Sequence, residues 1–582
     1  MSGRRSFSLL IAGLPALYST MLFAAPDAGT LHQERSADKA SAGFQANDQS
    51  SLNIVPPPLP AVNNHNKVQT VYISGFSVHG NTRLSDDELK EVLAPYINRQ
   101  VSVAEVHQAA TDLQQRYLDD GLLLAEVVIP SQIIQDHTVV TLHVYEGQLA
   151  ENGVYLVNSG ERVSDPVIHQ ILVSNLSSGE PVMQADIERT MLLSGDLPGI
   201  NVSGSLLPAA QAGEAVLQLI TEDTALVNGD LYVDNFGDYY TGQTRVGGSL
   251  FINSPAKRGD QLTLDFVTSG EGSVYGYGQY SLPVGGSGLR LGASLDYLNY
   301  ELGEEYEDFD VKGHAYEATL LGHYPLRRSV HHNLRLNGIL SSLRMHDEDN
   351  INGESDRRVD KLQLGMDGDQ EVTFYRTAEF SYGLSLNLGQ LSILGDDNYK
   401  AADKLTTDTD GTFALLRYHA AWLQHLGGDW SAFAMLDGQF AGSNLDTSQK
   451  FYVGGPYDVA GYPVAEVSGD QGTQLHMDVR YDFRDGLMNA DTQLSVFYSQ
   501  GWVTLFKDPW SGWEGSNDQI KNNFSLKSIG LSLHNTWPQG YQLQAIIARQ
   551  LGDNPGSDPQ NGEDSDRSDS DYRGWLQLVY FF

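Results

Sequence analysis

The chain has 582 residues, no cysteine and a formal net charge of −38 at pH 7. The absence of cysteine excludes a disulfide framework and a thiolate metal site. The negative charge argues against nucleic acid or anionic lipid as the main partner, because both bind clustered Lys and Arg. Beyond the N-terminus no run of about 18 apolar residues occurs, so helical membrane spans are not expected.

The N-terminus has the layout of a secretory signal peptide. Two arginines precede an apolar stretch from Phe7 to Phe23, and the small residues Ala24 and Ala25 follow it. No cluster of Lys or Arg comes next, as it would after a membrane anchor. Residues 1–25 are therefore predicted to be a signal peptide that is cleaved near Ala24 or Ala25, and the mature protein is predicted to be exported.

Residues 26–67 are polar and then rich in proline ("NIVPPPLPAVNNHN"), which predicts an extended linker. Within this segment, "LHQERSADKASAGFQA" (residues 31–46) fits a short polar helix and a disordered stretch about equally well. Both alternatives stay open at this point.

Residues 68–147 have the pattern of a small α+β domain. A strand-like run is followed by two helices, each opened by a capping box, Ser85 with Glu88 and Ser102 with Glu105. The second helix has one apolar face and a glycine placed to end it: Val106, Ala110, Leu113, Tyr117 and Gly121. Two β-rich runs follow. Residues 148–223 repeat the order β-α-α-β-β, which predicts tandem modules with a period of about 75 residues.

After about Ala225 the chain consists mainly of alternating segments. In "HMDVRYDF" one face carries Met477, Val479, Tyr481 and Phe483, and the other face is polar or charged. "QLTLDF" and "KLQLGMD" alternate in the same way. Such strands fit a barrel with lipid outside and water inside, although a soluble antiparallel sandwich gives a similar alternation.

Three features favour the transmembrane antiparallel β-barrel. The signal peptide exports the chain, and short turns such as "GGSG" and "PLRRS" alternate with long acidic connections such as "MHDEDNINGESDRR", "GDDNYKAADKLTTDTDGT" and "GDNPGSDPQNGEDSDRSDSDYRG". The chain also ends in "WLQLVYFF", with an aromatic residue at its terminus. At about 22 residues per strand and connection, this region has room for roughly 16 strands.

The ordered motifs of the chain resemble the TpsB transporters of two-partner secretion, the haemolysin secretion/activation type, over nearly all of the mature sequence. The motifs that carry the resemblance are "GNTRLSDDEL", "IPSQIIQDHTVVTLHVYEGQL", "DLPGINVSGSLLPAAQAGEAVLQL", "DNFGDYYTGQTRVGGSLFINSPAKRGDQLTL" and "YSLPVGG". The resemblance implies the following division: a signal peptide (1–25), a plug or linker (26–67), POTRA domain 1 (68–147), POTRA domain 2 (148–223) and an outer-membrane barrel (224–582).

The resemblance also implies a functional loop within "YVGGPYDVAGYPVAEVSGDQG". In the family, the sixth surface loop folds back into the lumen and ends in Val-Arg-Gly-Tyr or Phe, and its Arg pairs with the Asp of a Phe-x-Asp-x-Gly motif on the barrel wall. Here the matching residues of the loop tip are Val459, Ala460, Gly461 and Tyr462, and those of the wall are Phe497, Ser499 and Gly501.

Both members of the family's ion pair are therefore missing. Losing only one would leave an uncompensated charge, which costs several kcal/mol where it is well buried. The double loss predicts a loop held by packing and hydrogen bonds from Tyr462, Tyr457 and backbone groups. The alternative is an ordinary surface loop that matches the motif by chance.

No catalytic signature is present: the chain lacks a Walker phosphate loop, a H-E-x-x-H helix and a G-x-S-x-G elbow. The adjacent His331 and His332 are expected to be solvated, and Asp410 with Gly411 lacks the spacing of an EF-hand. We therefore expect no enzyme, no cofactor and no metal site.

By resemblance, we expect a translocator of the bacterial outer membrane that recognises a large β-rich exoprotein of the TpsA type and secretes it, unfolded and without ATP, through the barrel. Its POTRA domains would lie in the periplasm. Periplasmic chaperones and the barrel-assembly machinery would serve its biogenesis, with Leu578, Tyr580 and Phe582 as the assembly signal of the last strand. The alternative is an assembly factor of the same superfamily, an insertase. A passive porin would need no POTRA repeat, and a secreted enzyme would need a catalytic passenger for which the sequence has no room.

Overall fold

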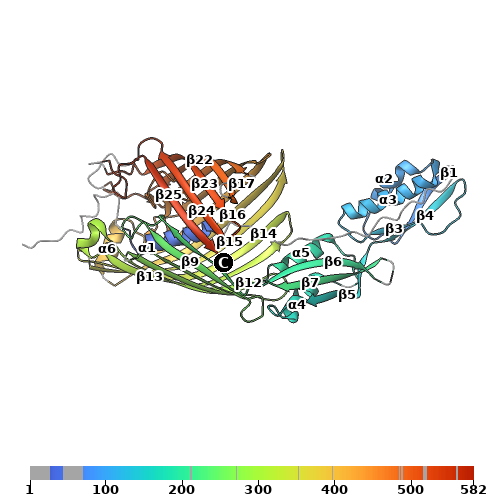
Figure 1. The fold of residues 1–582 in the computed structure, drawn as a ribbon, viewed down its shortest axis with the longest axis horizontal. Helices are drawn as coiled ribbons and strands as arrows, with labels where there is room; N and C mark the ends of the chain where they lie inside the picture. The colour runs from blue at the N-terminus through green and yellow to red at the C-terminus, as the bar shows by residue number, and fades with distance from the viewer. Residues whose placement is uncertain are drawn as a thin grey trace, which may run out of the picture.

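The computed structural model describes residues 26–42 and 70–582, apart from short gaps at 178, 210, 212, 271, 352, 396, 484–485, 487–488, 515–520 and 559–561. The predicted signal peptide lies outside the described residues, as does most of the proline-rich segment. A β-barrel carries two small α+β domains that extend from one of its ends, and a single helix lies inside the barrel (Figure 1). None of the helices in these ranges is long and apolar enough to cross a membrane.

The first α+β domain contains a four-stranded sheet in the order β2-β1-β4-β3. Its elements are β1 (Thr70–His79), α2 (Asp86–Leu93), a 3-10 turn (Ala94–Tyr96), β2 (Arg99–Ser102), α3 (Val103–Asp119), β3 (Glu126–Val128) and β4 (Thr138–Tyr145). Both predicted capping boxes form, and Gly121 adopts a φ of 87° directly after α3. The apolar face of α3 is buried against the sheet, so the sequence predicted this domain correctly except for the short β2.

The second α+β domain has the predicted order of elements and a three-stranded sheet, β5-β7-β6. It consists of β5 (Gln148–Asn158), α4 (Asp165–Asn175), α5 (Gln184–Gly195), β6 (Ile200–Pro208) and β7 (Glu214–Asp223). Strands β5 and β7 are parallel, while β6 and β7 are antiparallel. Aliphatic residues of α4 and α5 form one core with the sheet.

Sixteen antiparallel strands close the barrel, as the sequence predicted. They are β8 (Val227–Asp234), β9 (Arg245–Asn253), β10 (Gln261–Thr268), β11 (Ser273–Pro283), β12 (Arg290–Glu301), β13 (Lys312–Arg327), β14 (His332–Asp349), β15 (Gly353–Thr373), β16 (Thr377–Leu394), β17 (Gly411–Gly427), β18 (Trp430–Ala441), β21 (Gln471–Phe483), β22 (Asp491–Thr504), β23 (Asn523–Thr536), β24 (Tyr541–Gln550) and β25 (Tyr572–Phe581). The connections include a 3-10 turn (Glu304–Phe309) and helix α6 (Asp397–Leu405).

The alternation along the strands separates a lipid-facing surface from a lumen. In β21, Met477 and Val479 are exposed while Asp478 between them is buried. Strand β15 repeats the pattern with the exposed residues Leu362, Leu364 and Met366. Because the period of a strand is two residues, one face of each strand meets lipid and the other meets the interior of the barrel.

One predicted surface loop is wrong. The acidic segment 345–358 is not a long irregular connection, because β14 continues to Asp349 and β15 starts at Gly353. The charges pair across this hairpin, for example His346 Nδ1 with Asp356 Oδ1 at 2.9 Å. Alternating charges of opposite sign stabilise neighbouring strands, so an acidic composition alone does not show where a strand ends.

The second α+β domain is seated on the short turns of the barrel. Arg189 donates hydrogen bonds to the carbonyls of Ser287 and Pro325, each at 3.0 Å. Arg328 pairs with Asp196 at 2.8 Å. The short turns therefore lie on the side of the α+β domains, whereas α6 lies at the opposite end of the barrel (Figure 1).

The first and last strands of the barrel are paired with each other. The register of β25 with β8 runs from Gln577–Asp234 to Phe581–Asp230. Phe582 and Gly229 continue the ladder by exchanging two backbone hydrogen bonds, of 3.0 and 3.1 Å. At the other end Asn235 accepts a hydrogen bond from the Leu576 amide at 2.8 Å. Backbone hydrogen bonds therefore close the seam from Leu576 to Phe582 in this structure.

Candidate functional site

The lumen of the barrel contains helix α1 (Ala28–Ala42), drawn in blue in Figure 1. The helix thus exists, starting before the predicted residue 31, and residues 43–46 of the predicted segment lie outside the described residues. Ala28 and Leu31 are buried in an apolar cluster with Leu298, Tyr300 and other inward-facing residues of the wall. The helix contacts β12, β13 and β14 and the 3-10 turn Thr447–Gln449 (η4).

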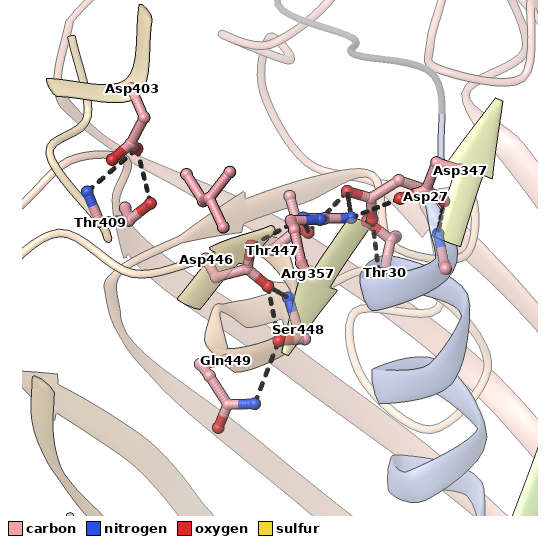
Figure 2. A network of polar contacts seen from close by, with 12 residues as sticks. Asp27, Thr30, Asp347, Arg357, Asp403, Thr409, Asp446, Thr447, Ser448 and Gln449 are labelled. Carbon is pink, nitrogen blue, oxygen red and sulfur yellow. Dashed lines mark hydrogen bonds and ion pairs between the residues drawn. The ribbon is translucent and has the colours of Figure 1, made fainter. Parts of the chain in front are cut away.

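Arg357 on β15 connects three carboxylates from separate parts of the chain (Figure 2). Its Nη2 is 2.7 Å from Asp27 Oδ2 before α1 and 2.7 Å from Asp347 Oδ2 on β14. Its Nη1 is 2.7 Å from Asp446 Oδ2 in the connection after β18. One guanidinium therefore ties the helix, the wall and the inward connection together. Such charge-assisted hydrogen bonds fix geometry well.

The same carboxylates also cap local structure. Asp27 accepts a hydrogen bond from the Thr30 amide at 2.8 Å, as an N-cap does. Asp347 accepts one from the Ala28 amide, also at 2.8 Å. A Cβ on Gly29 would lie 2.7 Å from Thr447 Oγ1, so only glycine permits this approach of the helix to η4. The N-terminal turn of α1 is therefore positioned by both its backbone and its side chains.

The connection from β18 to β21 folds back into the barrel and contains a two-stranded sheet of β19 (Phe451–Val453) and β20 (Val467–Gly469). A buried ion pair joins its two ends, with Lys450 Nζ 2.6 Å from Asp470 Oδ1. The Lys450 ammonium also lies over the Phe506 ring, 4.8 Å from the centroid. No local signal in the sequence indicates this ion pair at the root of the loop, because its two residues are 20 positions apart.

The tip residues Val459, Ala460 and Tyr462 are buried almost completely. Val459 and Tyr462 pack with Val453, Val503 and Leu526 among others. A Cβ on Gly461 would lie 2.9 Å from Ser528 Cβ on β23 and 3.0 Å from Gln550 N at the end of β24. The tip therefore touches the wall so closely that the third position of the motif has room only for hydrogen.

Two aromatic residues add directional contacts to the tip. Trp575 on β25 donates a hydrogen bond from Nε1 to the carbonyl of Ala460 at 2.8 Å. Tyr457 meets Phe236 edge to face, with ring centroids 5.5 Å apart. The tip is thus held by apolar packing, by aromatic rings and by a hydrogen bond to its backbone.

The wall motif lies beside the loop. Phe497 belongs to the same apolar cluster as Ala460 and Trp575. A Cβ on Gly501 would lie 2.4 Å from a methyl group of Val453, so this glycine accommodates β19. Ser499 is fully buried and its Oγ lies 2.8 Å from His476 Nδ1. The structure therefore brings Phe497 and Gly501 to the loop, while Ser499 faces a neighbouring histidine on β21.

Leu578, Tyr580 and Phe582 lie on the exposed outer face of the last strand and at its end. The Tyr580 ring is tilted against that of Tyr541 on β24, with ring centroids 4.8 Å apart. These residues face outward, where lipid surrounds the barrel.

Glu466 connects the inward loop to the last long connection of the barrel. Its carboxylate accepts hydrogen bonds from Asn554 Nδ2 at 2.5 Å and from Ser565 Oγ at 2.6 Å. Burial, together with the neighbouring Asp564 carboxylate, raises the pKa of Glu466 to about 8. This contact was not predicted, since a single glutamate in a Gly-rich stretch has no distinguishing sequence signal.

Two POTRA-like domains on a closed, filled barrel place the protein in the class of outer-membrane barrels with periplasmic domains. The family profile described as "Haemolysin secretion/activation protein ShlB/FhaC/HecB" matches residues 213–509, and the one described as "POTRA domain, ShlB-type" matches residues 71–147. The chain therefore belongs to the ShlB/FhaC/HecB family, the TpsB transporters of two-partner secretion.

Relatives and solved structures agree with this assignment. The chain is 23% identical to the heme/hemopexin transporter protein HuxB of Haemophilus influenzae (strain 86-028NP), over 86% of this chain and 85% of that one. It is 20% identical to the hemolysin transporter protein HpmB of Proteus mirabilis, over 81% and 82%. The structure of CdiB from Escherichia coli superposes with a TM-score of 0.72 at 16% identity, covering 96% of this chain and all of that chain.

The protein is accordingly an outer-membrane transporter with periplasmic POTRA domains that secretes a partner protein of the TpsA type, and it is not an enzyme. The side of the barrel that carries the short turns and the POTRA domains is the periplasmic side. The end that carries α6 is the extracellular side.

Proposed function

We propose that the protein exports one large, β-rich exoprotein, unfolded and without ATP, through the lumen of its own barrel. The observation that carries this proposal is the closed barrel whose lumen holds two separate segments, α1 and the inward loop, each attached by side-chain contacts instead of being part of the wall. A barrel with such an interior is closed at rest and opens when the segments rearrange.

Recognition begins at the POTRA domains by strand addition. The sheet orders leave β2 and β3 as edges in the first domain, and β5 and β6 in the second. Tyr155 on the edge strand β5 is 60% exposed, and Leu207 on β6 is 44% exposed. An exposed edge offers unpaired backbone groups to an extended segment, and alternate side chains supply specificity. The N-terminal secretion domain of the exoprotein would pair there.

Passage then requires α1 to leave its position. The described start of α1 is attached partly by polar contacts around Arg357 and Asp27, which water can replace. Buried ion pairs contribute little net stability relative to their solvated state, because desolvation offsets the Coulomb attraction. These contacts therefore fix the position of α1 in the lumen but still allow the helix to leave. The loop with Val459 to Tyr462 would rearrange in a second step.

The energy for export comes from folding outside the cell. A chain that folds on the far side is removed from the unfolded population, so net movement follows by mass action. No ATP-binding phosphate loop occurs in the sequence. Periplasmic chaperones and the barrel-assembly machinery serve the biogenesis of the transporter, and the outward face of Leu578, Tyr580 and Phe582 is the surface that we assign to assembly.

The second candidate function is an insertase for other outer-membrane barrels. Insertion would require strands β8 and β25 to separate at the seam. The paired register from Gln577 to Phe581, continued by Phe582 and Asn235, favours the translocator. A seam that opens would need to break these backbone hydrogen bonds first.

Mass spectrometry of proteins that are released or displayed by cells with and without the gene separates the two candidates. Loss of one large exoprotein, with other outer-membrane proteins unchanged, is the expected result and names the cargo. A decrease of many outer-membrane barrels would overturn the proposal in favour of the insertase. Collapse of the membrane potential with an uncoupler should leave secretion of presynthesised exoprotein intact if neither ATP nor a gradient drives it.

A further inference from the structure

Where α1 meets the wall, three potential metal ligands from distant parts of the chain converge. His32 on α1 lies with Nε2 2.8 Å from Asp296 Oδ1 on β12 and 3.8 Å from Glu317 Oε2 on β13. All three ligand atoms lie within 4.8 Å of one another. His32 and Asp296 are 264 residues apart in sequence, so no local spacing could have indicated the cluster, and the sequence predicted no metal site.

The two carboxylates lie close together in a poorly solvated place, where a second cation besides Lys361 would be favourable. Asp296 and Glu317 are directly opposite each other in the register of β12 and β13. Only 6% of the Asp296 side chain and 17% of the Glu317 side chain are exposed. Like charges directly opposite each other on neighbouring strands are destabilising, and poor solvation increases the cost.

We propose that His32, Asp296 and Glu317 form a binding site for a divalent transition-metal cation that cross-links α1 to the barrel wall. One imidazole and two carboxylates carry two negative charges, which a divalent cation neutralises. An imidazole ligand favours zinc and other first-row transition metals over magnesium and calcium, which prefer oxygen ligands only.

The geometry requires only small side-chain movements. In a tetrahedral zinc site with bonds of about 2.1 Å, ligand atoms are about 3.4 Å apart. The observed separations of 2.8 and 3.8 Å from His32 Nε2 lie on both sides of that value. Three protein ligands leave a fourth position for water, as in open zinc sites. The Lys361 ammonium on β15 interacts electrostatically with the Glu317 carboxylate. Its positive charge lowers the affinity of the site for a cation, but Lys361 does not occupy a ligand position.

The site gives the plug a second attachment that differs in kind from that of Arg357. The Arg357 guanidinium is covalently part of strand β15, whereas the occupancy of a bound cation depends on its free concentration. Metal binding stabilises the state that presents the ligands together. The cation therefore holds α1 in the lumen, and its removal favours release. This consequence depends on the proposed role of α1 as a plug, but binding of the cation does not.

The first test measures zinc on the purified full-length protein in detergent. After equilibration with Zn²⁺ and desalting, elemental mass spectrometry should find about one zinc per chain. His32→Asn should weaken zinc binding at least about 10-fold, because even outer-sphere changes cost 10- to 100-fold. Asp296→Asn preserves the shape of the side chain and should weaken zinc binding similarly. Because Asp296 lies on the wall, this variant checks that the loss in His32→Asn does not come from a misplaced helix.

His476→Asn is the matched control. His476 also faces inward and contacts a carboxylate, that of Asp478, but Asp478 already forms an ion pair with Arg480. This variant should bind zinc as the unmodified protein does. Wild-type protein without bound zinc, or zinc binding unchanged by His32→Asn, would overturn the proposal. The second result would assign zinc to a place other than His32.

The second test concerns the plug. In planar bilayers, Zn²⁺ should lower the frequency of channel openings of the wild-type protein and EDTA should restore it, whereas His32→Asn should respond to neither. If zinc binds at His32 but openings do not change, the site stands and the proposed gating by α1 fails. The two ideas are thus separable.

Discussion

The two segments inside the barrel are attached by different kinds of contact: polar contacts are prominent at the start of helix α1, and apolar packing is prominent at the tip of the inward loop. In the part of α1 whose side chains the structure describes, residues 28–35, Ala28 and Leu31 are buried in an apolar cluster, and polar contacts of Asp27 and His32 add to them. The tip of the inward loop buries Val459, Ala460 and Tyr462 in apolar surroundings, and the Lys450–Asp470 ion pair lies at the root of the loop.

This difference indicates an order of events. Polar contacts can be exchanged for water or for another charged group at small net cost, whereas exposure of Tyr462 and Val459 to a wet lumen would lose their full burial free energy. We therefore expect α1 to leave first and the loop tip to stay against the wall for longer.

Arg357→Ala should release the plug. It leaves three carboxylates without their common cation, and breaking a buried pair by removing one partner costs about 3–5 kcal/mol. Open-channel current in planar bilayers should rise well above that of the unmodified protein. Arg358→Ala is the control, because Arg358 is partly exposed and pairs with Asp360 on its own strand. Equal currents for the two variants would refute the role of Arg357.

Tyr462→Ala should loosen the loop tip without releasing α1. Truncation of a fully buried aromatic side chain costs about 3–5 kcal/mol, and Tyr462 has no exposed surface. Limited proteolysis of the folded barrel should cut within residues 451–470 in this variant. Tyr462→Phe keeps the ring and should remain resistant. Cleavage of both variants, or of neither, would show that ring packing does not hold the tip.

Ala460→Arg should impair folding or secretion more than Ala460→Arg combined with Ser499→Asp. The single change places an uncompensated charge in the apolar cluster with Phe497 and Trp575, and the second change supplies a carboxylate on the nearby wall strand. Secretion of the exoprotein and heat-modifiable mobility of the barrel are the measurements. Equal secretion by the single and the double variant would contradict the idea that the pair was lost together.

Glu466 should give the loop a modest dependence on pH. Its pKa is raised from the ordinary value of 4.5 to about 8, so its neutral form favours the buried state. The contribution is fully present below about pH 4.5 and is lost as pH rises through about 8. Hydrogen exchange of residues 451–470 should therefore increase over this range. Glu466→Gln should flatten the dependence, and an unchanged slope would show that another group is responsible.

Local signals in the sequence were sufficient for the two helices of the first POTRA domain. The capping boxes at Ser85 and Ser102, the apolar face of α3 and Gly121 are all encoded within a few residues of one another. The alternation of β21 and β15 likewise predicted which side chains face lipid. Each of these features depends on a short period or on one hydrogen bond to a neighbouring residue.

The contents of the lumen were less predictable. The sequence left the helix of residues 31–46 open, because its polar composition gives no amphipathic signal, and it became definite only where Asp27, Arg357 and Asp347 meet. The strands of residues 345–358 were missed because cross-strand pairing, not composition, extends the hairpin. Lys450, Glu466 and His32 have partners that lie at least 20 residues away in sequence.

The sequence by itself predicted the tandem modules from a repeat of about 75 residues. It predicted the barrel and its lipid-facing surface from alternation with a period of two residues. Only the tertiary structure decided how the lumen is filled and which charges meet there. Closing the barrel brings residues hundreds of positions apart within hydrogen-bond distance, and no local pattern records such a meeting.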